Sequence, residues 1–170
     1  MAEAFNAMSL PAAKAERYAT VAAEIASVLE GERNAVARMA TLVAMLAQSF
    51  EWFFWTGLYL VDAERPDELV VGPYQGTLGC LRISIGKGVC GAAAARRQTQ
   101  VVPDVEAFAG HIPCDSRSKS EIVVPVLGAD GRLLGVLDVD STELAAFDET
   151  DARWLEQIIA QTFGEATTLP

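Results

Sequence analysis

The stretch Glu121–Asp140, EIVVPVLGADGRLLGVLDVD, decides the fold class. It contains two β-type runs, Glu121–Leu127 and Arg132–Asp140, separated by the turn sequence Gly128-Ala129-Asp130-Gly131. An Asp-Gly pair between two such runs is a strong hairpin signal. The stretch therefore predicts a pair of antiparallel strands, and the rest of the chain is interpreted around it.

This hairpin also predicts a cluster of carboxylates. Period-two alternation places Asp138 and Asp140 on one face of the second strand, and antiparallel pairing brings Glu121 beside them. Three like charges in one place are destabilising unless something binds them. Two interpretations stay open, a solvated polar strand end and a site for a cationic ligand such as an ammonium group.

The flanking sequence supplies further strands and helices. Apolar residues at helical spacing predict N-terminal helices within about 10–50, with Ser9 and Pro11 as start signals, and a closing helix at about 148–164. Between them, the sheet and its loops are expected at about 52–141. The expected strands and the inserted helix are Trp52–Val61, Glu68–Tyr74, Leu81–Ile85, helix Val89–Gln98 and Gln100–Val102, followed by an irregular loop at 103–120. The 170 residues predict a single α+β domain, an antiparallel sheet with helices packed on it.

Composition narrows the class of partner. The net charge is −10, with 13 basic and 23 acidic residues, which disfavours nucleic acid and anionic membrane surfaces. Uncharged stretches such as Met39–Phe50 are far shorter than the ~20 apolar residues that span a bilayer. The N-terminus lacks the pattern of a signal peptide. We therefore expect a cytoplasmic protein whose partner is a small molecule or another protein, not a membrane.

Three cysteines are an odd number for a chain expected in the cytosol, where structural disulfides are rare. Core thiols, metal ligands and redox chemistry remain as roles. Cys80 and Cys114 fall in expected loops, and Cys90 falls at the apolar start of a helix. Redox cysteines must be accessible and able to reach a partner thiol, which the two loop positions allow.

Two other site types are weighed and set aside. Residues 86–91, GKGVCG, match the G-x-G-x-x-G pattern of dinucleotide sites, but a loop and a hairpin follow where β-α-β alternation is required. A glycine turn that packs a short helix on a sheet explains the pattern. Cys80, Cys90, His111 and Cys114 could supply four zinc ligands, but they include no C-x-x-C pair. We expect no metal and no cofactor, and we interpret His111 as a loop residue.

Seven short segments occur in an order that resembles a known family. They are WTGLYL at 55–60, GPYQG at 72–76, CLRI at 80–83, GKGVCG at 86–91, GHIPCD at 110–115, SEIV at 120–123 and GVLDVDS at 135–141. Together they resemble the free methionine-(R)-sulfoxide reductases, which are stand-alone GAF-domain enzymes. The resemblance runs from about residue 8 to about residue 162, and it implies one GAF domain over 1–170.

The resemblance also implies an activity and its residues. The expected reaction reduces free L-methionine-(R)-sulfoxide, with Cys114 as the nucleophile, Cys80 as the resolving cysteine and Cys90 as an auxiliary thiol. Thioredoxin is the expected reductant, and a homodimer with the N-terminal helices as contacts is the expected assembly. The alternative is a non-catalytic GAF module that binds a small ligand.

The residues supply a chemistry for that activity. A carboxylic acid kept protonated by its neighbours would protonate the sulfoxide oxygen, and we expect Glu121 and Asp140 to flank that oxygen. Asp138 would support them or hold the substrate ammonium. Trp55 and Tyr59 would form an apolar wall for the methyl-sulfinyl group, or else serve as core packing.

Overall fold

The computed structural model describes residues 10–166 and 168–170. In chain order the elements are α1 (Lys14–Val28), α2 (Ala35–Ser49), β1 (Trp55–Val61), β2 (Glu68–Gln75), β3 (Arg82–Ser84), α3 (Gly88–Arg96), β4 (Gln100–Val102), the 3-10 helix η2 (Val105–Ala107), β5 (Ser120–Leu127), β6 (Leu133–Ser141) and α4 (Glu149–Phe163). Among these described helices, none is long and apolar enough to cross a membrane. The prediction of an α+β chain is confirmed.

The strands form one six-stranded antiparallel sheet in the order β3-β2-β1-β6-β5-β4. The predicted hairpin is β5 and β6, and its turn places Gly131 at φ +75°, a backbone conformation that favours glycine. β6 pairs with β5 on one side and with β1 on the other. The carboxyl end of β6 therefore lies in the interior of the sheet, not at an edge.

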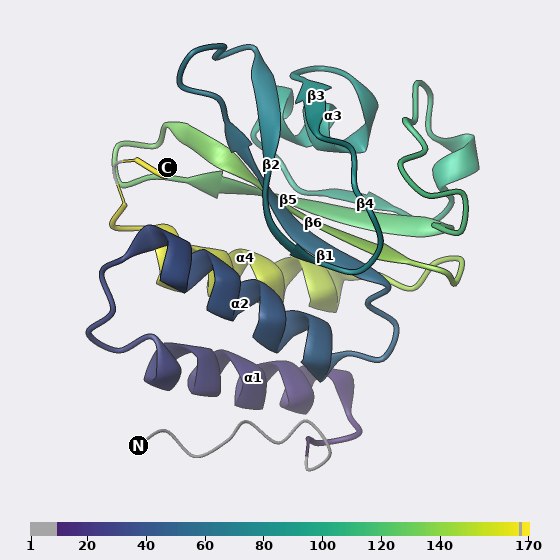
Figure 1. Ribbon diagram of the computed structural model, residues 1–170. Coiled ribbons are helices and arrows are strands. Elements are labelled where there is room, and N and C mark those ends of the chain that lie inside the picture. The colour runs from purple at the N-terminus through teal and green to yellow at the C-terminus, as the bar shows by residue number, and fades with distance from the viewer. Residues whose placement is uncertain (1–9, 167) are drawn as a thin grey trace.

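Helices cover the two faces of the sheet unequally. α2 and α4 lie against one face and α1 packs beneath them as an outer layer, while α3 sits alone on the opposite face (Figure 1). Side-chain alternation along the strands explains both packings. In β1, Leu58 and Leu60 join the core with the three larger helices, and Trp55 and Tyr59 face α3.

Two of the predicted elements begin later in the structure than in the prediction. α1 begins at Lys14 after Ala13, which provides no side-chain cap, instead of near Pro11; Ser9 lies outside the described residues. β1 begins at Trp55 instead of Trp52 because Phe53 N–H bonds back to the Phe50 carbonyl in a turn. α4 begins as predicted near Asp148, whose carboxylate forms a capping box with Asp151.

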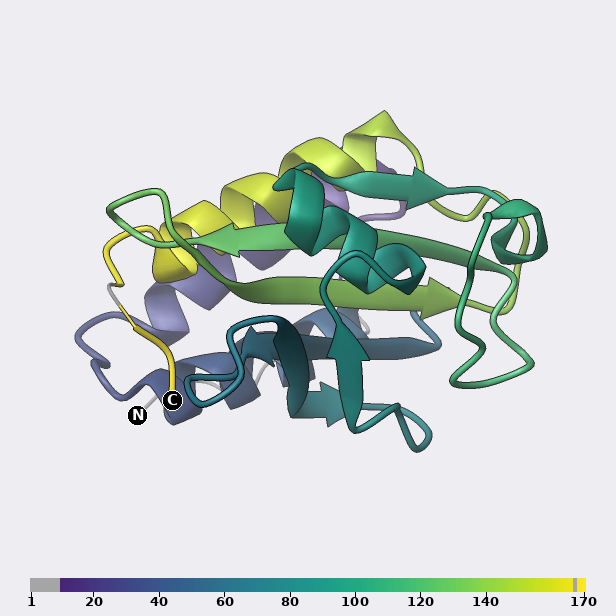
Figure 2. The ribbon, with the colours of Figure 1, turned by 90° about the horizontal axis from the view of Figure 1, so that it is seen from above.

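Irregular backbone gathers on the side of α3. Residues 103–119 contain the short helix η2 and are otherwise without regular structure, close to the predicted loop 103–120. Viewed from above, this segment hangs over the end of the sheet where β6 finishes (Figure 2). The segment 76–81 connects β2 to β3. This segment, residues 103–119 and α3 surround the cavity that is described below.

Candidate active site

One cavity lies between the sheet, α3 and the two loops. It is lined by predicted site residues from five separate parts of the chain: Trp55, Tyr59, Cys90, Cys114, Glu121, Asp138 and Asp140. The remaining predicted site residue, Cys80, is covalently attached to this group because a disulfide joins it to Cys114. The fold therefore brings together all the residues that the sequence singled out.

The three carboxylates are placed by strand register. Asp140 lies opposite Glu121 on β5 and opposite Trp55 on β1, and Asp138 lies opposite Val123 and Gly57. Directly paired residues in antiparallel strands share a face, so all three carboxyl groups point toward α3. Glu121 and Asp138 are 5% and 6% exposed. The predicted cluster is confirmed, and burial rules out the solvated strand end.

Burial sets the protonation of the cluster. Loss of hydration raises the pKa of Asp138 to about 6 and raises the pKa values of Glu121 and Asp140 well above their usual range. The neighbouring carboxylates raise the pKa values of Glu121 and Asp140 further. Neighbouring carboxyl groups titrate together, so the cluster retains at least one proton near neutral pH.

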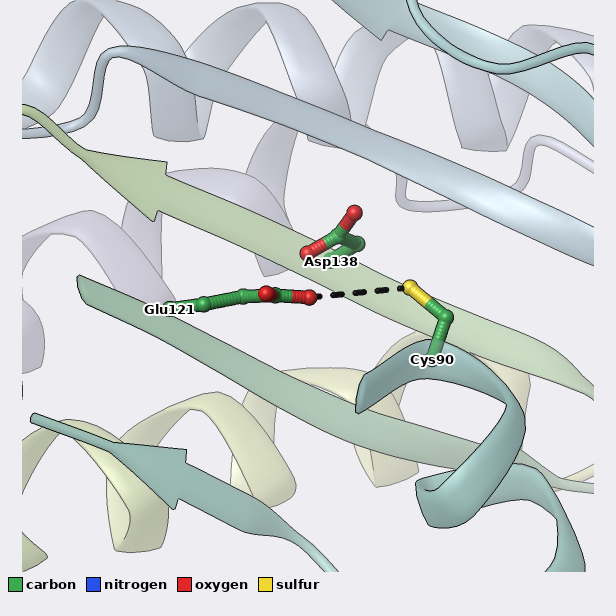
Figure 3. Close-up of side chains that lie close together, drawn as sticks. All are labelled: Cys90, Glu121 and Asp138. Atoms are coloured by element: carbon green, nitrogen blue, oxygen red, sulfur yellow. Dashed lines mark hydrogen bonds between the residues drawn. The ribbon is translucent and has the colours of Figure 1, made fainter. Parts of the chain in front are cut away.

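Cys90 belongs to this buried group and is separate from the other two cysteines. Its side chain points from α3 toward the sheet, and its thiol lies 3.9 Å from Oε1 of Glu121, with Asp138 beside them (Figure 3). Burial, followed by the negative charges of Asp138 and Glu121, raises the pKa of the Cys90 thiol. Cys90 therefore stays a neutral thiol, which can donate a hydrogen bond but is a poor nucleophile.

Metal binding has a geometric candidate in the same group. Ligand atoms of Cys90, Glu121 and Asp138 all lie within 4.8 Å of one another. Metal ligands must be deprotonated, and raised pKa values at all three positions oppose that. Two of the zinc ligands considered from the sequence, Cys80 and Cys114, are bonded to each other instead.

The disulfide between Cys80 and Cys114 joins the two loops at the cavity. The residues are 34 positions apart in the sequence, and their Cα atoms are separated by 5.4 Å. Cys114 is exposed and Cys80 is half-buried. A disulfide in accessible loops can be reached by an external thiol, whereas one in the core cannot.

Aromatic rings form the apolar side of the cavity. The Trp55 ring stacks on Tyr59 and Tyr74, with centroid separations of 5.8 and 5.3 Å. Gly57 makes room for this arrangement, because a Cβ atom at that position would collide with the Trp55 ring and with Cβ of Tyr74. Trp55 and Tyr59 are buried and also line the cavity, so the two interpretations drawn from the sequence, core packing and an apolar wall, both describe them.

Sequence reasoning missed His111 as a cavity residue. Its Nε2 atom lies 3.9 Å from Oε2 of Glu121, and partial burial lowers the pKa of its imidazole. The histidine is three residues before Cys114, which was the available signal, but it lies in an irregular loop in which no periodicity predicts where a side chain points. Ser118, a buried residue of the same loop, also lines the cavity, beside Asp140.

The glycine-rich segment 86–91 forms the turn that starts α3. Gly88 has φ +61°, and a Cβ atom on Gly91 would lie 2.5 Å from the Ser84 carbonyl oxygen. The glycines thus allow the helix to approach β3 closely. This agrees with the packing interpretation of the sequence pattern, and it brings Cys90 down onto the sheet.

Comparison with known proteins identifies the family to which this chain is related. The family model "GAF domain" matches residues 15–166. Free methionine-R-sulfoxide reductase of Escherichia coli is 41% identical over 148 residues, covering 87% of this chain and 87% of that protein. GAF domain-containing protein A of Dictyostelium discoideum is 50% identical over 146 residues, covering 86% of this chain and 90% of that one.

A solved structure agrees with these matches. The X-ray structure of free methionine-R-sulfoxide reductase from Neisseria meningitidis, in complex with its substrate, superimposes with a TM-score of 0.86 at 49% identity. The superposition covers 93% of each chain. The six-stranded antiparallel sheet with its helices is therefore the GAF fold, as the resemblance in the sequence implied.

Proposed function

The chain belongs to the GAF domain family and, within it, to the free methionine-R-sulfoxide reductases, and from this premise we propose that it reduces free methionine-(R)-sulfoxide to methionine in the cavity beneath the Cys80–Cys114 disulfide. The observation that carries the proposal is the position of that disulfide. It lies over a cavity that holds a buried, proton-retaining cluster of carboxyl groups. A thiol and an acid in one cavity are the two groups that sulfoxide reduction requires.

In the proposed first step the Cys114 thiolate attacks the sulfur of the sulfoxide. The oxygen leaves the substrate sulfur and ends on Cys114, so methionine is reduced by two electrons and the cysteine is oxidised to a sulfenic acid. The oxygen needs a proton as the bond to the substrate sulfur breaks. Glu121 and Asp140, which lie opposite each other in the sheet, are the proposed source of that proton.

In the second step the Cys80 thiol attacks the sulfenic acid. A sulfur–sulfur bond forms and water leaves, which gives the disulfide seen in the structure. A dithiol reductant then exchanges with this disulfide and restores both thiols. We propose thioredoxin for this role and the cytoplasm, where such reductants operate, as the location.

Substrate recognition is assigned to the two sides of the cavity. Trp55 and Tyr59 would contact the methyl-sulfinyl end through their rings. Asp138, whose Oδ1 atom is buried and has no hydrogen-bond partner among the described residues, would accept a hydrogen bond from the substrate ammonium. A methionine inside a peptide has no such ammonium, which accounts for selectivity toward the free amino acid.

Assembly is a separate part of the proposal. We propose a homodimer through the N-terminal helices, because Val28 and Val36 at the α1–α2 connection are 43% and 52% exposed. Light scattering of the protein in solution tests it, and a monomer at all concentrations would contradict it.

The test of the activity is turnover that depends on a reductant. With thioredoxin, thioredoxin reductase and NADPH, free methionine-(R)-sulfoxide should be converted to methionine, and sulfoxide within a peptide should not. A GAF module that only binds a ligand would bind methionine or its sulfoxide without consuming NADPH. That result would replace the proposed reaction with the binding function.

A further inference from the structure

The two loops that the disulfide joins are also joined by a hydrogen bond. The Thr77 hydroxyl donates to Oδ2 of Asp115 at 2.7 Å. Thr77 lies three residues before Cys80, and Asp115 directly follows Cys114. The same pair of loops therefore carries one covalent bridge and one non-covalent bridge side by side.

The acceptor side of this hydrogen bond is held in place. The backbone N–H of Arg117 donates to Asp115 Oδ1 at 2.9 Å, and its guanidinium donates to both carboxylate oxygens at 3.0 and 2.8 Å. That guanidinium lies over the Phe54 ring, 4.8 Å from the ring centroid. These contacts keep the pKa of Asp115 below its usual range, so it presents a fixed, ionised acceptor.

The loop that carries the donor, Thr77, is held against Trp55 of β1. Nε1 of Trp55 donates to the Thr77 carbonyl at 2.9 Å. Gly76 and Gly79 pack so closely that a Cβ atom on either would lie 2.8 or 2.9 Å from the Trp55 ring. Both loops are thus fixed to consecutive residues, Phe54 and Trp55, at the start of β1.

We propose that the Thr77–Asp115 hydrogen bond positions Cys80 for the resolving step: while no disulfide exists, it keeps the two cysteine loops together. The sulfenic acid on Cys114 then meets the Cys80 thiol, the disulfide forms and water leaves. The inference rests on the proposed function. Its physical basis is that a second link between two loops raises the effective concentration of the groups they carry. Thr77 is a positioning residue in this scheme and touches no reacting atom.

The test compares Thr77→Val with the wild-type protein in a single turnover. Methionine release in the first step should be unchanged, because Thr77 does not line the cavity. Disulfide formation should slow about tenfold, the size expected for a lost hydrogen bond to a charged acceptor. The delayed sulfenic acid should be trapped more fully by dimedone and detected by mass spectrometry. Thr77→Ser keeps the hydroxyl and should restore the rate of disulfide formation.

A matched control is Thr99→Val. Thr99 also donates its hydroxyl to a carboxylate, that of Glu156, but it lies in neither cysteine loop. Equal slowing in Thr99→Val, or wild-type resolution in Thr77→Val, would overturn the inference. So would slow resolution in Thr77→Ser.

A second measurement separates this inference from the proposed function. Equilibration with reduced and oxidised glutathione reports the effective concentration of Cys80 and Cys114 and needs no sulfoxide. The Thr77→Val disulfide should be about tenfold easier to reduce than the wild-type disulfide. That shift supports the positioning role even if the protein proves to reduce no sulfoxide, and its absence contradicts the role even if the protein does.

Discussion

Asp140 on β6 lies directly opposite Glu121 on β5, so the sheet itself holds two carboxyl groups side by side. Asp138, two residues earlier on the same face, completes the cluster under α3. Strand register is fixed by the packing of the opposite face, where Ile122, Leu137 and Val139 are buried in the core. Packing on the helix-covered face of the sheet therefore fixes the register that brings the three carboxyl groups together on the cavity face.

The cluster should make stability fall as the pH rises. Asp138 has its pKa raised from an ordinary 3.8 to about 6, so between these values the folded state holds a proton that the unfolded state has lost. At 1.36 kcal/mol per pKa unit, Asp138 alone should lower the free energy of unfolding by about 3 kcal/mol across this window, and the raised pKa values of Glu121 and Asp140 should add to that drop. Asp138→Asn should make the drop smaller. Urea unfolding from pH 4 to pH 7 measures it.

The control for this measurement is Asp67→Asn, which changes an exposed carboxylate between β1 and β2. Its pH profile should follow the wild-type profile. If Asp138→Asn also follows the wild type, Asp138 does not hold the proton assigned to it.

Amide substitutions should separate the acid from the binding groups. Glu121→Gln or Asp140→Asn should lower kcat by roughly 10²–10⁴-fold where it removes the general acid. Asp138→Asn should raise KM more than it lowers kcat, because it weakens ground-state binding of the ammonium. Steady-state kinetics with free methionine-(R)-sulfoxide makes the assignment. Unchanged kinetics in all three variants would remove the cluster from the reaction.

Cys80 and Cys90, the two cysteines that could resolve a sulfenic acid on Cys114, should behave differently when each is replaced by serine. Cys80→Ser should release about one methionine per chain and then stall with thioredoxin, because the sulfenic acid has lost its partner. Cys90→Ser should keep recycling, since Cys90 is 4% exposed on the sheet-facing side of α3 and its thiol stays protonated. Rapid quench gives the burst size for both variants. A stall in Cys90→Ser, with normal recycling in Cys80→Ser, would exchange the two roles.

A protein reductant should contact the exposed surface beside the disulfide as well as the disulfide itself. Leu81, beside Cys80, is 70% exposed, and its burial against a protein partner would favour docking. Leu81→Ser should raise KM for thioredoxin several-fold and leave turnover with dithiothreitol unchanged. Leu144→Ser, which changes a leucine that is 61% exposed outside both loops, is the control. Equal loss with both reductants would place Leu81 in folding instead of docking.

Much of the cavity was predictable because its geometry is local. The Asp-Gly turn sets the hairpin, and period-two alternation then puts Glu121, Asp138 and Asp140 together. The contacts of His111 with Glu121 and of Thr77 with Asp115 were not predictable. Each depends on the course of an irregular loop, and no periodicity in the sequence encodes such a contact.

The most direct test of the account is a single turnover without any reductant. Fully reduced protein, mixed with free methionine-(R)-sulfoxide, should yield about one methionine per chain and, in the same interval, the Cys80–Cys114 disulfide detected by peptide mass spectrometry. The S isomer should yield neither product, and Cys114→Ser should yield no methionine from either isomer. Methionine formed by Cys114→Ser, or an R isomer left intact by the reduced wild-type protein, would contradict the account.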